Sequence, residues 1–405
     1  MKTRLTNIKK EVFKKERLIF IFHSCGQLTG TERSLLNWCR FIDYTKIDIT
    51  ICVNEGTFWE AFKKGVPYVK LINFKFSENK LNLGNFIRLF IYFKNLRTTK
   101  VIWILNDMID FHFSELFPIW LAAKGNLNIA HFAYPDRIEK IKSRLWFGIL
   151  PGVGLWRLKW FSRQFINHFF AKRIYAQSTK AKDCLVSHWK ISSKKIFVSK
   201  GKGIDTEFFK PNNEAKKILR KQLNLSEKTR IFIAVNRFVK LKRIDRLLGA
   251  LLLLIKDNLG VCLLLVGDGK LKEFYENRVK RNSYLLKNVI FLEFQDDINR
   301  FIQGADFLLL ASDTEGQSNV IKEAMACGTI PIVTETPGCK EISDKIFMAE
   351  RSVFDFYRQI KKILSLPEEK LNLIREQYVE EIKSKYNLRD RVVDDLKIFN
   401  LPVSS

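Results

Sequence analysis

Short apolar runs alternate with amphipathic segments along most of this chain. Five runs in the first half have the length and composition of buried strands: 18–22, 47–53, 101–105, 127–132 and 174–177. Five more follow in the second half: 231–236, 261–266, 289–292, 307–310 and 330–333. Helical patterns lie between them, including one at 244–255. This alternation predicts an α/β fold, with parallel sheets covered by helices on both faces.

A polar stretch at 200–213, KGKGIDTEFFKPNN, interrupts the pattern and suits a linker. The 405 residues are enough for two domains of ordinary size. We therefore expect an N-terminal domain at 1–200 and a second domain at 201–375. Residues 376–405 would form a final helical segment that packs back on the first domain.

The loop and helix after the apolar run at 307–310 carry the clearest chemistry. Ser318 suits a helix N-cap and Gly328 a helix stop, so a helix is expected between them. A helix that begins just beyond the carboxyl end of a strand can hold a phosphate on its free amides. Glu315 lies before this helix and Glu323 on it, so both carboxylates are placed to accept hydrogen bonds from sugar or ribose hydroxyls.

A basic turn follows the first strand of the second domain. It places Arg237 and Lys242 at the carboxyl end of the same predicted sheet as Glu315 and Glu323. An arginine fork and a lysine point charge suit a diphosphate, although the turn alone also fits a solvated basic surface. The sequence Gly267-Asp268-Gly269 lacks the full dinucleotide fingerprint and reads better as a strand-end turn than as a NAD site.

Composition narrows the possible classes of protein. The seven cysteines are odd in number and form no C-x-x-C pair, which favours a reducing compartment over a disulfide scaffold. The N-terminus lacks the apolar core of a signal peptide, and no run approaches the roughly 18 apolar residues of a membrane span. No cluster of histidine, cysteine and aspartate has metal-ligand spacing.

The net charge of +27 lies mainly in the first half, where 35 basic residues face 14 acidic ones. Within it, the stretch 143–173 holds three Trp, five Phe, six basic residues and no acid. Such a stretch can contact an anionic membrane surface or stack on single-stranded nucleic acid. It can also be a buried helix pair with a charged rim, and the basic excess can be an ordinary lysine-rich solvated surface.

Six motifs in this order resemble the retaining family 4 glycosyltransferases of the GT-B fold. They are TGTER (29–33), GKGIDTEFFKP (201–211), VNRFVKLKRIDRLL (235–248), LLVGDGKLKE (264–273), ADFLLLASDTEGQSNVIKEAMACGTIPIV (305–333) and PGCKE (337–341). The resemblance implies two Rossmann-like domains that face a central cleft. The first would hold the acceptor and the second a nucleotide sugar.

The resemblance also implies roles for single residues. Glu315 would contact donor-sugar hydroxyls, Glu323 the ribose, and Arg237 with Lys242 the pyrophosphate. The stretch from Gly316 through Gln317 and Ser318 to Asn319 would lie over the diphosphate.

The match departs from the family pattern in the first domain and in the basic turn. The first loop of the family carries adjacent glycines, whereas here Thr29 precedes Gly30, which the resemblance implies is a donor-binding residue. Arg243 stands where a glycine is common, and Lys202 replaces an asparagine in the linker motif. His131 matches a histidine near the donor sugar in the family, and a packed histidine is the alternative.

The sequence thus predicts a hexosyltransferase-type enzyme. It would move a sugar from a nucleoside-diphosphate sugar to a polysaccharide, lipopolysaccharide or lipid-linked acceptor in cell-envelope glycan synthesis, with no metal or other cofactor. We expect a cytoplasmic location that allows peripheral contact with the cytoplasmic face of the inner membrane. An anionic membrane surface is a candidate partner, and nucleic acid is not an expected one. The alternatives are a non-catalytic nucleotide-sugar-binding subunit and a basic nucleic-acid-binding protein.

Overall fold

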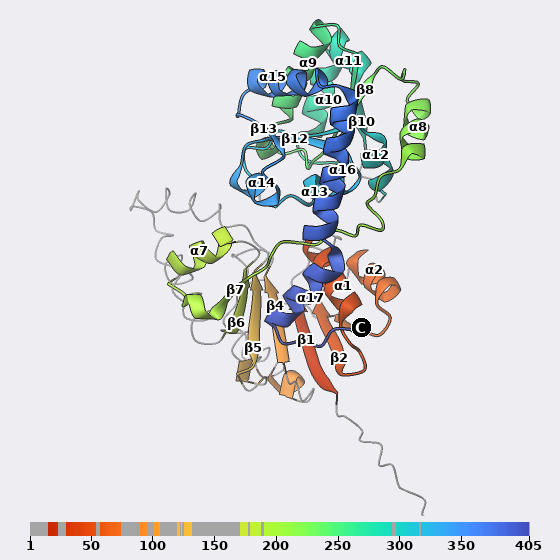
Figure 1. The fold of residues 1–405 in the computed structure, drawn as a ribbon. Coiled ribbons are helices and arrows are strands. Elements are labelled where there is room, and N and C mark those ends of the chain that lie inside the picture. The colour runs from red at the N-terminus through yellow and green to blue at the C-terminus, as the bar shows by residue number, and fades with distance from the viewer. Residues whose placement is uncertain are drawn as a thin grey trace, which may run out of the picture. The chain divides into compact units, whose positions relative to one another are not determined.

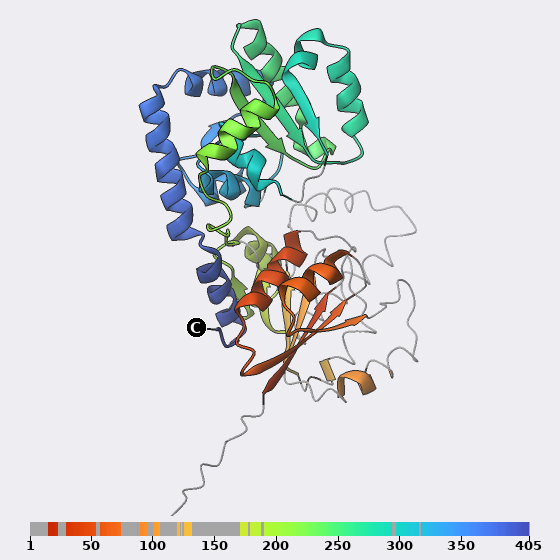
Figure 2. The same cartoon turned by 90° about the vertical axis from the view of Figure 1, so that its right-hand side faces the viewer.

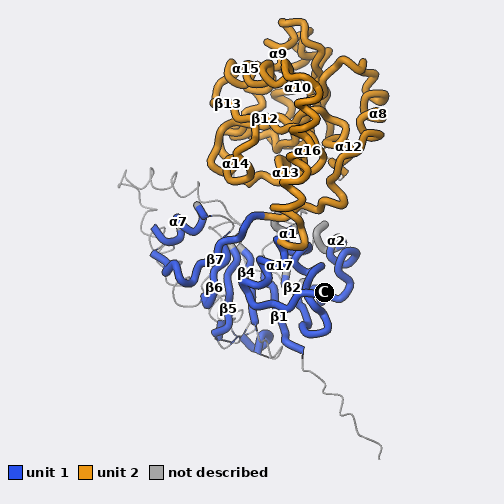
Figure 3. Tube along the Cα trace, viewed as in Figure 1, with its two compact units in different colours: residues 1–201, 391–405 blue, residues 202–390 orange. Residues whose placement is uncertain are grey.

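A computed structural model describes most of the second half of the chain and the framework of the first. The described residues are 15–22, 30–53, 57–73, 87, 90–94, 100–105, 120, 121, 123, 125–131, 171–176, 179–187, 190–293, 297–315 and 317–404. They divide into two compact units (Figure 3). The first comprises residues 1–201 with 391–405, and the second comprises residues 202–390.

A parallel sheet of seven strands forms the framework of the first unit, in the order β3-β2-β1-β4-β5-β6-β7 (Figure 1). The strands are β1 (Glu16–Phe22), β2 (Ile47–Val53), β3 (Lys70–Asn73), β4 (Lys100–Leu105), β5 (Leu127–His131), β6 (Ala171–Ala176) and β7 (Ile196–Val198). Its helices include α1 (Gly30–Phe41), α2 (Thr57–Gly65), α7 (Thr179–Ser187) and the short η1 (Ser193–Lys195). The strand order reverses between β1 and β4, as in doubly wound folds.

The second unit has a parallel sheet of six strands, in the order β10-β9-β8-β11-β12-β13. The strands are β8 (Arg230–Val235), β9 (Val261–Val266), β10 (Val289–Leu292), β11 (Phe307–Leu310), β12 (Ile330–Thr334) and β13 (Phe347–Ala349). The order reverses between β8 and β11, so the carboxyl ends of these two strands form the switch point where doubly wound sheets bind ligands.

Helices cover this second sheet. They are α8 (Asn213–Gln222), η2 (Lys240–Lys242), α9 (Ile244–Lys256), α10 (Lys272–Lys280), α11 (Ser283–Asn288), α12 (Asn299–Gly304), α13 (Asn319–Ala326), α14 (Pro337–Ile342), α15 (Val353–Leu364) and α16 (Glu368–Lys385). All residues of β9, β11 and β12 are buried, which explains their continuous apolar runs. The predicted α/β architecture is confirmed. No described helix is long and apolar enough to cross a membrane.

The last helix, α17 (Leu388–Ile398), continues from α16 and packs on the first unit (Figure 2). Its buried Asp395 accepts hydrogen bonds from Trp38 Nε1 at 3.3 Å, Tyr175 Oη at 3.1 Å and Ser199 Oγ at 2.8 Å. The Trp38 ring also packs edge-on against Phe399, with 5.7 Å between the ring centroids. One buried carboxyl thus joins the end of the chain to α1, β6 and the segment after β7.

Burial raises the pKa of Asp395 from 3.8 to about 6. A raised carboxyl pKa means that the fold favours the protonated form, so its contribution to stability is complete below about pH 4 and is lost as the pH rises through 6. The loss is on the order of 2–3 kcal/mol. We expect the melting temperature of the wild type to fall, relative to that of Asp395→Asn, as the pH rises from about 4 to 7. Thermal denaturation across this pH range measures the difference.

The exposed carboxyl of Asp183 on α7 provides a control for this comparison. The curve of Asp183→Asn should run parallel to that of the wild type. A parallel curve for Asp395→Asn as well would contradict the expected role of the buried carboxyl.

Candidate functional site

The candidate site lies at the switch point of the second sheet, where two loops leave adjacent strands. One loop follows β8 and leads through η2 to α9, and the other follows β11 and leads to α13. Both strands are apolar and almost wholly buried, so they fix the starting points of the two loops. Sequence-distant side chains are brought together here because β8 and β11 are neighbours in the sheet.

The two loops are joined by one backbone hydrogen bond and one ion pair. The amide of Asp313 donates to the carbonyl of Leu241 at 2.9 Å. Beside this contact, Lys242 Nζ donates to Glu315 Oε1 in a partly buried ion pair. The structure therefore brings together two of the residues that the sequence predicts for the site, from positions 73 residues apart.

Arg243, the residue after Lys242, has a left-handed backbone conformation, with φ 48° and ψ 47°. A non-glycine residue pays about 1–2 kcal/mol for this conformation, which explains why a glycine suits the position. The Arg243 guanidinium offsets the cost through a two-point ion pair with Asp245, at 3.1 and 2.8 Å, and a longer one with Asp313 at 3.4 Å. The hydrogen bonds from Arg243 lower the pKa of the Asp245 carboxyl.

Arg246 on α9 holds the loop after β11 in place through hydrogen bonds. Its side chain is buried and donates to the carbonyl of Ala311 at 2.6 Å and to Asp313 Oδ1 at 3.0 Å. Asp313 therefore forms ion pairs with two arginines, Arg246 on α9 and Arg243 in the turn before α9. These contacts fix the position of the loop that carries Glu315 relative to α9.

The turn after β9 packs against the first loop and leaves no room for side chains. A Cβ on Gly267 would lie 2.0 Å from the carbonyl oxygen of Asn236, and one on Gly269 would lie 2.7 Å from that of Phe238. Both glycines have positive φ, 134° and 148°. Phe238 also exchanges backbone hydrogen bonds with this turn, to Asp268 and from Leu271. The Gly-Asp-Gly motif is thus a strand-end turn that supports the site.

The start of α13 has the arrangement expected from the sequence. Ser318 is the N-cap residue, but its hydroxyl makes no capping hydrogen bond. The first amides of a helix have no partner within the helix. At the other end, Gly328 has φ 75° and follows the C-cap Cys327, as a helix stop requires.

Four buried or half-buried side chains in the two loops and at the start of α13 carry polar atoms without a hydrogen-bond partner. They are Asn236 at both Oδ1 and Nδ2, Ser312 at Oγ, Gln317 at Oε1 and Asn319 at Oδ1. The amide nitrogen of Gln317 is occupied, since it donates to Glu341 at 3.2 Å. Unpartnered buried polar groups are uncommon in folded proteins, and their concentration here is typical of a ligand site.

The structure also gives the positions in the fold of most of the remaining predicted site residues. Arg237 is exposed just after β8, and Glu323 is half-buried on α13, one turn beyond Asn319. Gly316 lies outside the described residues. In the first unit, Gly30 begins α1 and His131 ends β5.

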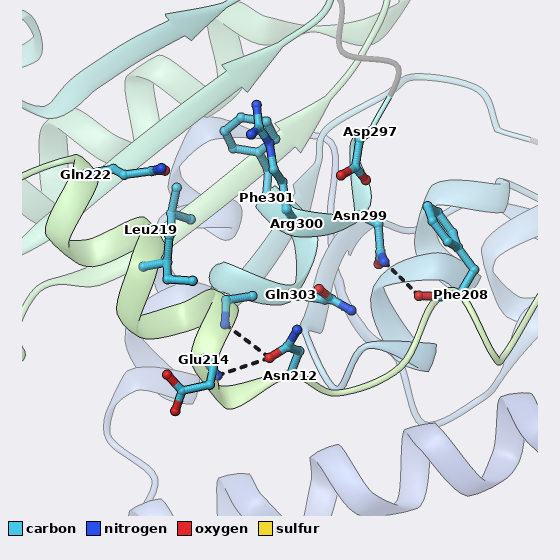
Figure 4. Close-up of a pocket in the computed structure, with 12 residues that line it drawn as sticks. Phe208, Asn212, Glu214, Leu219, Gln222, Asp297, Asn299, Arg300, Phe301 and Gln303 are labelled. Carbon is cyan, nitrogen blue, oxygen red and sulfur yellow. Dashed lines mark hydrogen bonds between the residues drawn. The ribbon is translucent and has the colours of Figure 1, made fainter.

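No group of three His, Cys, Asp or Glu side chains that could hold a metal ion occurs in the described part of the chain. A separate cavity of about 350 Å³ lies between α8 and α12 (Figure 4). Asn299 donates to the carbonyl of Phe208 at 2.7 Å along its wall, and Asn212 caps α8 there. The side chains predicted for the donor site do not line this cavity.

Residues 215–380, which include both loops, match the family of glycosyl transferases group 1. The second unit therefore carries a glycosyltransferase group 1 domain. A curated relative, N-acetyl-alpha-D-glucosaminyl L-malate synthase of Bacillus anthracis, is 34% identical over 125 residues. That match covers 31% of this chain and 32% of the relative, so the chain spans about a third of the relative's length.

Two solved structures extend the likeness to nearly the whole chain. A glycosyltransferase from Rickettsia africae covers 96% of this chain and 98% of its own, with a TM-score of 0.74 and 18% identity. Anabaena Alr3699/HepE, solved in complex with UDP and glucose, covers 94% and 99%, with a TM-score of 0.70 and 15% identity. The predicted GT-B glycosyltransferase fold is confirmed, and the identities are too low to carry more than the fold.

Several residues that shape the candidate site were not predicted from the sequence. They are Asp313, Arg246, Asn236 and Ser312. Arg243 was noted only as a departure from glycine, and that departure was the signal for its left-handed backbone. For Arg246 no sequence signal exists, because an arginine in an amphipathic helix is normally exposed.

Proposed function

We propose that the protein is a retaining, family 4 hexosyltransferase that moves a sugar from a nucleoside-diphosphate sugar to a glycan acceptor. The observation that carries this proposal is the Lys242–Glu315 pair beside the start of α13, at the switch point of the group 1 domain. A cation, a carboxylate and free helix amides together suit a sugar joined to a diphosphate.

In this proposal Lys242 and Arg237 stabilise the charge that develops on the leaving diphosphate, with the amides at the start of α13. Glu315 orients the sugar through its hydroxyls, and Glu323 accepts from the ribose. The bond between the anomeric carbon and the phosphate oxygen breaks while the acceptor oxygen bonds to the same face. The acceptor proton passes to the departing phosphate oxygen, so the reaction needs no carboxylate nucleophile and no metal ion.

The first unit would hold the acceptor. Gly30, at the start of α1, would contact the donor, and His131, at the end of β5, would act near the donor sugar. Polysaccharide, lipopolysaccharide and lipid-linked acceptors are all proposed, in cell-envelope glycan synthesis on the cytoplasmic face of the inner membrane. The basic aromatic stretch supports contact with an anionic membrane surface, and its residues 143–170 lie outside the described residues. The alternative of nucleic acid has no support from the group 1 domain.

A donor screen tests the proposed function. Thermal shift with UDP-, GDP- and ADP-sugars should show stabilisation by one nucleotide class, worth about 2.7 kcal/mol at a hundred times the dissociation constant. Donor hydrolysis or transfer should then be detectable and should persist in EDTA. Absence of any shift in folded protein would contradict the proposal, and loss of turnover in EDTA would contradict its metal independence. Binding without turnover would favour a non-catalytic subunit.

A further inference from the structure

Two of the unpartnered side chains at the switch point are almost completely buried. Asn236 is 7% exposed, and neither its Oδ1 nor its Nδ2 has a partner. Ser312 is 0% exposed, and its Oγ has none. Leaving such groups unpaired lowers the stability of a protein, so their presence requires a reason.

The position of Asn236 and Ser312 in the fold suggests a reason for these unpaired groups. Asn236 is the first residue after β8 and Ser312 the second after β11, on the two strands that flank the switch point. The Lys242–Glu315 pair closes the same two loops. Both residues therefore lie in the two loops that form the proposed donor site, buried beneath its surface.

The backbone around both residues is held in place by contacts with neighbouring segments. The amide of Asn236 donates to the carbonyl of Val266 at 2.9 Å, and its own carbonyl leaves no space for a Cβ on Gly267. The carbonyl of Ala311, just before Ser312, is held by the buried Arg246. The polar groups are thus preorganised before any ligand arrives.

The chemistry of the two side chains narrows the ligand group. A carboxamide offers one donor and one acceptor side by side, and a hydroxyl can do either. Phosphate oxygens only accept, so a diphosphate would leave Asn236 Oδ1 unmatched and facing negative charge. A hydroxyl both donates and accepts. We propose that Asn236 and Ser312 bind a hydroxyl-bearing part of the donor, its ribose or its sugar, and set donor specificity; this inference rests on the proposed function.

The test measures donor affinity and thermal stability in the same variants. Asn236→Leu and Ser312→Ala remove the polar groups with little change in shape. Each should weaken binding of the nucleotide sugar by about 10- to 100-fold, because a ligand hydroxyl loses its partner. Each should also leave the melting temperature of the ligand-free protein unchanged or raised, because an unpaired buried group is gone.

Ser343→Ala is the matched control. Ser343 is also buried, at 4% exposure, but its Oγ donates to Glu381 at 2.9 Å. Its replacement should lower the melting temperature and leave donor affinity unchanged, the reverse of the result expected for Ser312→Ala. Should Asn236→Leu fail to fold, Ser312→Ala still decides the question.

Binding of the bare nucleoside diphosphate identifies the hydroxyl. An equal loss of affinity for nucleotide and nucleotide sugar places the group on the ribose, and a loss for the nucleotide sugar alone places it on the sugar. Wild-type affinity in both variants would overturn the inference, as expected if buried water satisfies these groups. A joint loss of stability and affinity would overturn it too, because it indicates a structural role. Failure of the wild type to bind any nucleotide sugar would instead reject the proposed function.

Discussion

Replacing Lys242 with alanine should reduce sugar transfer by about 10²–10³-fold, the cost of losing one preorganised charge at a developing anion. Lys242 reaches Glu315 across the switch point and forms a partly buried ion pair with it. Glu315→Gln should cause a loss of similar size, since the neutral amide no longer accepts as strongly from sugar hydroxyls. Steady-state rates and donor affinities for both variants measure the effect.

The control for Lys242→Ala is Lys240→Ala. Lys240 lies in the same short helix η2 but is exposed to solvent. Its replacement should leave kcat and KM within about twofold, since an exposed lysine contributes little. Near-normal turnover in both Lys242→Ala and Glu315→Gln would contradict the site assignment.

The double variant adds a second criterion. Residues in direct contact act as a unit, so the combined loss should be smaller than the product of the two single losses. Fully multiplicative losses would mean that Lys242 and Glu315 act on separate parts of the substrate, and that their ion pair is incidental to transfer.

The framework of the site could be predicted because it depends on local patterns. The apolar run at Phe307–Leu310, the N-cap at Ser318 and the helix stop at Gly328 are each set by neighbours in sequence. Parallel pairing then places all strand ends on one edge, so the proximity of Lys242 to Glu315 follows from the order of elements.

The supports of the site could not be predicted, because they depend on tertiary neighbours. Arg246 is buried only because the carbonyl of Ala311 and the carboxylate of Asp313 lie beside it. Asn236 and Ser312 have ordinary residue types for strand ends, and only their burial without partners distinguishes them.

Asp306 shows the same limit at the amino end of β11, the opposite edge of the sheet from the proposed donor site. Its side chain is completely buried, and Oδ2 accepts from Arg220 Nη2 at 3.0 Å and from the amide of Ile231 at 2.9 Å. Lys216 Nζ lies 2.5 Å from Oδ1. This carboxylate therefore joins α8 to β8 and β11.

Asp306→Ala should lower the free energy of unfolding by about 3–5 kcal/mol, because the guanidinium of Arg220 stays buried without its counter-charge. For a unit of this size the loss corresponds to roughly 10 °C in melting temperature. Asp306→Asn should cost less, since its side-chain oxygen can still accept from the amide of Ile231. Denaturant unfolding of the three proteins measures the difference.

Glu207→Ala provides the exposed counterpart, because Glu207 forms a solvent-exposed ion pair with Lys210 at 3.8 Å. Its replacement should change stability by less than about 1 kcal/mol. Folded Asp306→Ala should bind the nucleotide sugar as the wild type does below its melting temperature, since the change lies away from the switch point. A stability loss no larger than that of Glu207→Ala would contradict this expectation. It would mean that the free energy of desolvating Asp306 cancels the stabilisation from its hydrogen bonds and ion pairs, and that apolar packing alone holds α8 to the sheet.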